Sequence, residues 1–111
     1  MARHEVHTGD VFYLPAGRIH AICSGIMLAE IQQASDLTYR IYDYDRRDID
    51  GNKRVLHTEL ASEALDYEVL SEYRTIYTDD MQRANPCIDS PFFSVRIVDF
   101  EGSFHRNLKK Y

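Results

Sequence analysis

Residues 9–20 read GDVFYLPAGRIH, and this stretch decides the fold that we predict. An apolar run at residues 11–14 is stopped by a Pro-Ala-Gly turn signal at residues 15–17. A second apolar run follows at residues 19–23. Short apolar runs that contain aromatic and β-branched residues and are separated by tight turns predict antiparallel strands.

The same pattern continues to about residue 58. Apolar residues return at residues 26–31, and residues 38–44 read TYRIYDY, in which alternate side chains point to opposite faces of a strand. Asp50, Gly51 and Asn52 form a further turn signal. Several short strands joined by such turns predict an antiparallel barrel or sandwich.

The later part of the chain changes character. Thr58 can cap a helix near residues 59–68, where apolar residues recur at helical spacing. An irregular connector, punctuated by Asn85-Pro86 and Ser90-Pro91, follows this helix. Residues 92–100 alternate again and predict another strand. The predicted class is therefore mainly β, with one short helix.

Composition excludes several functions. The 111 residues carry a net charge of −5, which argues against nucleic acid as a partner because phosphate binding requires a basic surface. No apolar run approaches the ~20 residues of a membrane span, and no signal segment opens the chain. Cys23 and Cys87 lie in no metal-binding spacing. We therefore expect a cytoplasmic protein that has no membrane partner.

Polar side chains are densest between His20 and Arg46. A histidine and a carboxylate, His20 and Glu30, stand near strand ends and are suitable ligands for a divalent metal. Arg40 could stabilise an oxyanion or orient a phosphate. The alternative is structural: His20 would be a hydrogen-bonded strand residue, and Glu30 and Arg40 would form a cross-strand ion pair. Arg46 lies among aspartates, so the alternative for it is a solvated turn.

The segments GDVFYLPAG (9–17), His20-Ala21, AEIQQ (29–33) and SDLTYRIYD (35–43) together resemble type I mannose-6-phosphate isomerases. These are zinc-dependent cupins of the bacterial short form. The resemblance implies a cupin-like, jelly-roll half barrel of antiparallel strands. It also implies the interconversion of mannose 6-phosphate and fructose 6-phosphate through an enediol.

The resemblance assigns roles by position. His20 matches the last zinc ligand of the family, and Arg40 matches its active-site arginine. Glu30 matches an acidic residue near the same cavity, so we assign Arg40 and Glu30 to catalysis. Asp36 and Arg46 match residues expected close to the substrate. Zinc is the implied cofactor, and a sugar phosphate is the implied small-molecule partner.

The resemblance also implies a division of the chain. Residues 1–58 would be the second half of the catalytic cupin, 59–89 a short helix and connector, and 90–111 the first strands of a C-terminal β domain. The remaining zinc ligands of the family belong to a first cupin motif that this sequence lacks, so we expect the chain alone to be inactive. We expect a homodimer or association with the missing half. The alternatives are a non-catalytic sugar-phosphate-binding or assembly module and one half of a split isomerase.

Overall fold

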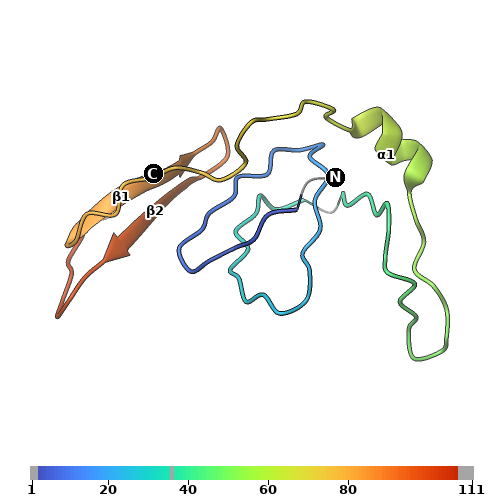
Figure 1. Ribbon diagram of the computed structural model, residues 1–111, viewed down its shortest axis with the longest axis horizontal. Coiled ribbons are helices and arrows are strands. Elements are labelled where there is room, and N and C mark those ends of the chain that lie inside the picture. The colour runs from blue at the N-terminus through green and yellow to red at the C-terminus, as the bar shows by residue number, and fades with distance from the viewer. Residues whose placement is uncertain (1–2, 36, 108–111) are drawn as a thin grey trace. The chain divides into compact units, whose positions relative to one another are not determined.

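One helix and two strands make up the regular secondary structure of the described residues, 3–35 and 37–107 of the computed structural model (Figure 1). They are α1 (Thr58–Ala64), β1 (Arg83–Asp89) and β2 (Ser94–Asp99). No helix in the described residues is long and apolar enough to cross a membrane. The described residues thus confirm the prediction of antiparallel β structure with one short helix.

The chain divides into two compact units. Unit 1 joins Met1–Tyr13 to Ser71–Tyr111, and unit 2 is the continuous segment Leu14–Leu70. Unit 1 therefore contains β1 and β2, whereas unit 2 contains α1 and the segment in which the candidate site residues were predicted.

The β1–β2 hairpin is the regular part of unit 1. The strands pair antiparallel from Arg83 opposite Asp99 to Asp89 opposite Ser94, and the register shifts between Pro86 and Ile88. The strand predicted at residues 92–100 is confirmed as β2. The expectation of an irregular connector through Pro86 is wrong, because β1 forms there. A strand paired on one side tolerates proline at an edge or a bulge, where the missing N–H removes no ladder bond.

The interior of unit 1 lies against β1. Asn85 is fully buried, its Nδ2 donates to the Asp80 carbonyl at 2.9 Å, and its Oδ1 accepts from Thr78 Oγ1 at 3.4 Å. Cys87 is also buried, and this burial raises the pKa of its thiol. Because the buried amide is hydrogen-bonded on both its nitrogen and its oxygen, it joins β1 to the preceding loop, and these bonds offset the cost of burying it.

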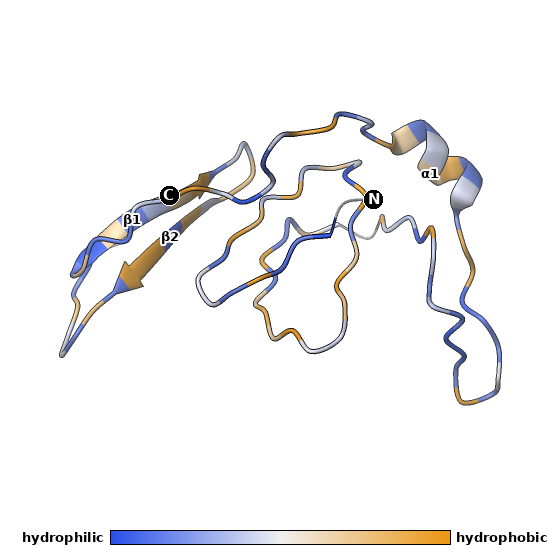
Figure 2. Ribbon diagram, in the orientation of Figure 1, coloured by the Kyte–Doolittle hydropathy of each residue, from blue (hydrophilic) through white to orange (hydrophobic). Residues whose placement is uncertain are grey.

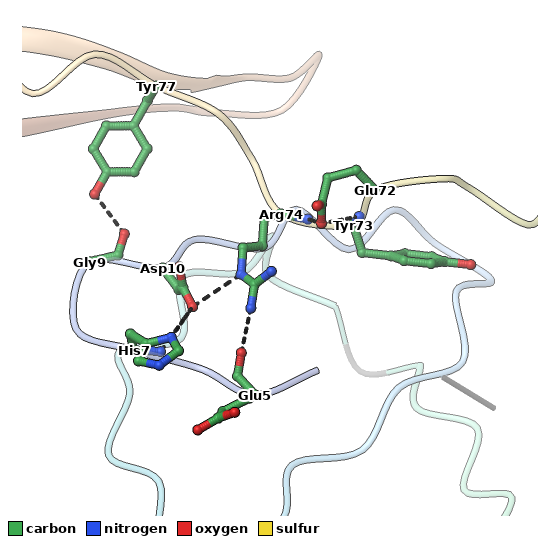
Figure 3. A network of polar contacts seen from close by, with 8 residues as sticks. All are labelled: Glu5, His7, Gly9, Asp10, Glu72, Tyr73, Arg74 and Tyr77. Atoms are coloured by element: carbon green, nitrogen blue, oxygen red, sulfur yellow. Dashed lines mark hydrogen bonds and ion pairs between the residues drawn. The ribbon is translucent and has the colours of Figure 1, made fainter. Parts of the chain in front are cut away.

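A polar network joins the two chain segments of unit 1 (Figure 3). Arg74 Nε donates to Asp10 Oδ2 at 3.2 Å, and Arg74 Nη2 donates to the Glu5 carbonyl. The main-chain N–H of His7 donates to the same Asp10 oxygen at 2.9 Å. His7 is therefore part of a turn closed by Asp10.

Hydrogen bonds to main-chain carbonyl groups strengthen the connection between these two segments. Tyr77 Oη donates to the Gly9 carbonyl at 2.6 Å (Figure 3). Thr75 N donates to the Val11 carbonyl at 2.8 Å, and Phe12 and Arg74 form an isolated antiparallel bridge. Residues 9–12 thus pair with a segment more than sixty positions away, which no local pattern predicts.

The helix differs from its prediction at both ends. Its N-cap is His57, with no side-chain cap hydrogen bond, so Thr58 is a helical residue and not the cap. The helix ends before Leu65, which has extended geometry (φ −71°, ψ 135°), and does not reach residue 68. Asp66 explains this early end, because its N–H donates to the Gly17 carbonyl at 3.0 Å instead of continuing the helix.

The strands predicted within residues 11–44 do not form a ladder in the described part of the chain. Only Phe12 makes an isolated bridge there. Apolar side chains of these segments are exposed, among them Ile22 at 51% and Leu28 at 49%, and Figure 2 shows hydrophobic residues along these coils. Alternation creates an apolar face, but a strand also needs a neighbour for its N–H and C=O groups. The half barrel is therefore not confirmed.

Candidate functional site

The carboxylate of Asp43 lies at the centre of the candidate site, which belongs to unit 2. Asp43 is only 8% exposed. Arg54 Nε donates to Asp43 Oδ2 at 2.7 Å, and Arg54 Nη2 donates to Oδ1. Two parallel N–H···O bonds between a guanidinium and a carboxylate fix both groups in one plane. This ion pair closes the loop between residues 43 and 54.

Arg40 lies beside the same carboxylate. Its Nε is 4.0 Å from Asp43 Oδ1, and its Nη1 donates to the Val55 carbonyl at 3.4 Å. The main chain of Arg40 pairs with His57: Arg40 N donates to His57 Nδ1 at 3.2 Å, and His57 N donates to the Arg40 carbonyl at 2.7 Å. Arg40 is therefore held through both its backbone and its side chain.

Arg46 supplies the third guanidinium near Asp43. Asp43, Arg40, Arg46 and Arg54 together form the Asp43 cluster. The Nε of Arg46 is 3.7 Å from Asp43 Oδ1, and its Cζ lies 5.4 Å from the centroid of the Tyr44 ring. The side chain is nevertheless 63% exposed. An arginine that is oriented by a carboxylate and an aromatic ring, and that still faces solvent, can bind an external anion.

A tight turn at residues 43–46 brings Arg46 close to Asp43. Arg46 N donates to the Asp43 carbonyl at 3.0 Å. The two central residues, Tyr44 and Asp45, both have φ of 54°. Positive φ at two successive residues defines a type I′ turn, a geometry that favours Asn and Gly and is unusual for a bulky aromatic residue. The surrounding contacts therefore stabilise a backbone conformation that Tyr44 does not prefer.

The charged groups of the cluster shift one another's pKa values. The hydrogen bonds from Arg54, followed by the charges of Arg54, Arg46 and Arg40, hold the pKa of Asp43 below its usual range against the opposing effect of burial. The hydrogen bond to Asp43 likewise raises the pKa of Arg54. Three guanidinium groups around one carboxylate leave the cluster positively charged. A hollow beside it is lined by Arg46, Arg47, Asp48 and Arg54.

The other predicted site residues lie outside this cluster. His20 is exposed, and its Nδ1 is 3.0 Å from the Arg18 carbonyl, so the neutral ring carries its proton on Nδ1 and leaves Nε2 as the acceptor. Glu30 is exposed. No contact among the described residues joins His20 or Glu30 to Arg40. Asp36 lies outside the described residues.

The described residues do not fit a complete zinc site. Within them, no group of three or more His, Cys, Asp or Glu side chains is placed to share a metal ion. The tautomer of His20 suits a ligand that binds through Nε2, but one imidazole supplies one of the three or four protein ligands that zinc requires. We therefore derive no catalytic step through a metal.

Sequence reasoning missed Asp43 and Arg54. The aspartates around Arg46 indicated that the charges of this segment cancel one another in a solvated turn. The structure instead buries Asp43 and leaves the side chain of Asp45 73% exposed. His57 is half-buried and accepts a hydrogen bond from Arg40 N. The available signal was the alternation within residues 38–44, which places Asp43 on the same face as Tyr39 and Ile41.

Comparisons with known proteins identify relatives of this chain. No family model matches it, and no solved structure matches it. It is 38% identical to mannose-6-phosphate isomerase ManA of Bacillus subtilis over 105 residues, which are 93% of this chain and 33% of that protein. It is 40% identical to mannose-6-phosphate isomerase of Streptococcus mutans over 104 residues, again 93% of this chain and 33% of the relative.

These relatives first define a class: the chain is a homologue of isomerases. More particularly, it is a homologue of mannose-6-phosphate isomerases over 93% of its own length. The resemblance deduced from the sequence segments is thereby confirmed. The chain spans about a third of the length of these curated relatives.

Proposed function

We propose that this chain is part of a mannose-6-phosphate isomerase, which interconverts mannose 6-phosphate and fructose 6-phosphate. The observation that carries the proposal is the 38% identity to ManA over 93% of the chain. The Asp43 cluster adds chemical support, since its guanidinium groups suit a phosphorylated, oxygen-rich substrate. The sugar phosphate is accordingly the proposed partner.

The proposed reaction moves one proton between adjacent carbons. Glu30 would act as the base that removes the proton from C2, while the electron pair forms a double bond between C1 and C2 and places negative charge on the C1 oxygen. The guanidinium of Arg40 would stabilise that oxygen. The C2 hydroxyl proton then passes to the C1 oxygen, and Glu30 returns its proton to C1 as the C2 oxygen becomes the carbonyl of the ketose. Asp36 and Arg46 would bind the substrate.

We retain zinc as the proposed cofactor, with His20 as one of its ligands. The hydrogen bond at His20 Nδ1 supports this assignment, because it fixes the imidazole and leaves Nε2 for a metal. Zinc would polarise the sugar oxygens when bound. The other ligands would come from outside the described residues, and the isolated chain is expected to bind zinc only weakly.

The finer architecture is also a proposal. We infer a cupin-type jelly roll in which residues 1–58 are half of the catalytic barrel, 59–89 are the helix and a connector that ends in β1, and 90–111 start a C-terminal β domain. The apolar residues exposed within 14–31 support the inference that further strands cover this segment. The covering strands would come from a second copy of the chain or from the missing half. The proposed location of the protein is the cytoplasm.

A chimaera tests the proposed function. The 105 residues of B. subtilis ManA that align with this chain are replaced by it, and the chimaera is expressed in a bacterium that lacks mannose-6-phosphate isomerase. Growth on mannose is the expected result. A soluble chimaera that binds mannose 6-phosphate but supports no growth would favour the non-catalytic binding module.

Separate expression distinguishes the split-enzyme alternative. In a second strain, this chain and the remainder of ManA are produced as two polypeptides. Growth of this strain as well as the chimaera strain would show that the two parts assemble without a covalent link, as one half of a split isomerase requires. Growth of the chimaera strain alone would favour a single continuous enzyme.

A further inference from the structure

We propose that Asp43 is a positioning residue, whose carboxylate fixes the guanidinium of Arg40 against the substrate and is itself held by Arg54. This inference rests on the proposed function for its catalytic consequence, because Arg40 is the proposed stabiliser of the enediolate oxygen. Asp43 itself touches no reacting atom in this account. Its role is to set where Arg40 can lie.

Burial distinguishes Asp43 from the other acids. It is the one charged residue that is buried among the described residues. A buried carboxylate is tolerated when its oxygens are paired, and Arg54 supplies this pairing with two N–H groups. Oδ2 accepts from Arg54 Nε, whereas Oδ1 is shared and faces the Nε atoms of Arg40 and Arg46 at 4.0 and 3.7 Å.

The surroundings of Arg40 leave one part of its guanidinium available. Its Nε faces Asp43 and its Nη1 donates to the Val55 carbonyl. Within the described residues, its Nη2 meets no hydrogen-bond acceptor. The side chain is 27% exposed, so this remaining N–H group can reach an external oxygen. A guanidinium that is hydrogen-bonded through Nη1, attracted by a carboxylate 4.0 Å from its Nε and open at Nη2 is oriented to bind a developing negative charge.

The turn next to Asp43 supports a positioning role. Tyr44 and Asp45 occupy the left-handed region, where non-glycine residues are strained. That geometry brings the Asp43 carbonyl to Arg46 N at 3.0 Å and keeps the carboxylate between Arg40 and Arg46. A relaxed turn would move the carboxylate away from one of these two residues. The strained conformation is thus coupled to the placement of both guanidinium groups.

Asp45 provides a matched control for Asp43. It lies in the same turn, two positions away, and its exposed carboxylate contacts Lys53 rather than an arginine of the cluster. Asp43→Asn and Asp45→Asn each remove one negative charge from this turn. Only the first removes the group that faces Arg40.

The first measurement uses the full chain and does not depend on activity. Nuclear magnetic resonance relaxation of the arginine Nε–H groups reports how rigidly each side chain is held. We expect the order parameter of Arg40 Nε–H to fall below ~0.6 in Asp43→Asn and to stay at the wild-type value in Asp45→Asn. An unchanged, high order parameter in a folded Asp43→Asn variant would overturn the proposal.

The second measurement uses the ManA chimaera and separates kcat from KM. Asp43→Asn should lower kcat by about a hundredfold with little change in KM, because a misplaced catalytic group weakens the transition state more than the bound substrate. Asp45→Asn should match the wild type. If Asp43→Asn does not fold, Asp43→Glu keeps the charge but moves it by one methylene, and kcat should still fall at least about tenfold.

The outcomes separate the two proposals. A wild-type chimaera without isomerase activity contradicts the proposed function, while the order parameter of Arg40 still decides whether Asp43 positions it. An active wild-type chimaera in which Asp43→Asn or Asp43→Glu keeps the wild-type kcat contradicts the positioning role alone.

Discussion

Arg54 binds the carboxylate of Asp43 with two N–H groups, Nε to Oδ2 at 2.7 Å and Nη2 to Oδ1. The two residues are eleven positions apart and close a loop that contains the turn at Tyr44 and Asp45. A salt bridge on an open surface contributes little to stability, whereas breaking a buried one leaves a charge without its partner. Only the carboxylate of this pair is buried, since the Arg54 side chain is 48% exposed, so loss of Arg54 would leave the buried Asp43 carboxylate without its two hydrogen bonds.

Acid should weaken unit 2 through Asp43. Its folded-state pKa lies below the ordinary value of 3.8, so its contribution to the free energy of unfolding is complete above that pH and is lost as the pH falls through the folded-state pKa. Asp43→Asn should remove this part of the acid dependence. We would follow acid unfolding by circular dichroism in the wild type and in both Asp43→Asn and Asp45→Asn. Identical acid transitions in the wild type and Asp43→Asn would contradict the expectation.

Gly17 is predicted to be the least replaceable glycine of unit 2. Its φ is +84°, and an added Cβ would lie 2.5 Å from the Ala64 carbonyl oxygen and 3.0 Å from Asp66 N. Gly25 has nearly the same φ, +80°, but a Cβ there would meet nothing within 4 Å. Gly25→Ala thus measures the cost of the backbone conformation alone, about 1–2 kcal/mol.

Gly17→Ala should lower the free energy of unfolding by about 1–3 kcal/mol more than Gly25→Ala, because it adds a steric clash with main-chain atoms. Denaturant titration of the two variants measures this difference. Equal midpoints for the two variants would show that residues 64–66 do not approach Gly17 as described.

His20 and Arg40 should fail in different ways when they are replaced in the ManA chimaera. His20→Ala should abolish tight zinc binding, because it removes a ligand. Arg40→Lys should leave zinc bound and lower turnover, since loss of a planar oxyanion donor typically costs ~3–4 kcal/mol of transition-state stabilisation. Metal analysis and kcat of each purified variant provide the test. Wild-type kcat in Arg40→Lys would make Arg40 a structural residue only.

The isolated chain is predicted to self-associate. Leu14, Ile19, Ile26 and Leu28 are each at least 40% exposed, although they belong to segments that the sequence predicts as strands. Burying apolar surface contributes ~25 cal/mol per Å², so pairing with a second copy is favourable. Light scattering at micromolar concentration should show species larger than 13.0 kDa. A monodisperse monomer that unfolds cooperatively would contradict this prediction.

The sequence predicts those elements whose causes are local. The alternation of residues 92–100 predicts β2, and the helical spacing after Thr58 predicts α1. The end of α1 was not predictable, because it depends on a hydrogen bond from Asp66 to Gly17, almost fifty positions earlier. β1 was hidden by Pro86, whose tolerance depends on the single partner strand and the bulge.

The candidate site shows the same limit. The family resemblance predicts Arg40 and Arg46 as site residues, but it gives no reason for their placement. That reason is the burial of Asp43, which a count of neighbouring charges cannot predict because Asp45 and Asp48 have the same chemistry. Only the geometry of the turn at Tyr44 selects Asp43 as the shared partner of three arginines.

The most direct test of the account is the rate at which the purified, zinc-loaded ManA chimaera converts mannose 6-phosphate to fructose 6-phosphate. The isolated chain under the same conditions is the control. We predict turnover by the chimaera that depends on Arg40, and negligible turnover by the chain alone. A folded chimaera without isomerase activity, or an isolated chain that turns over at an ordinary enzymatic rate, would contradict it.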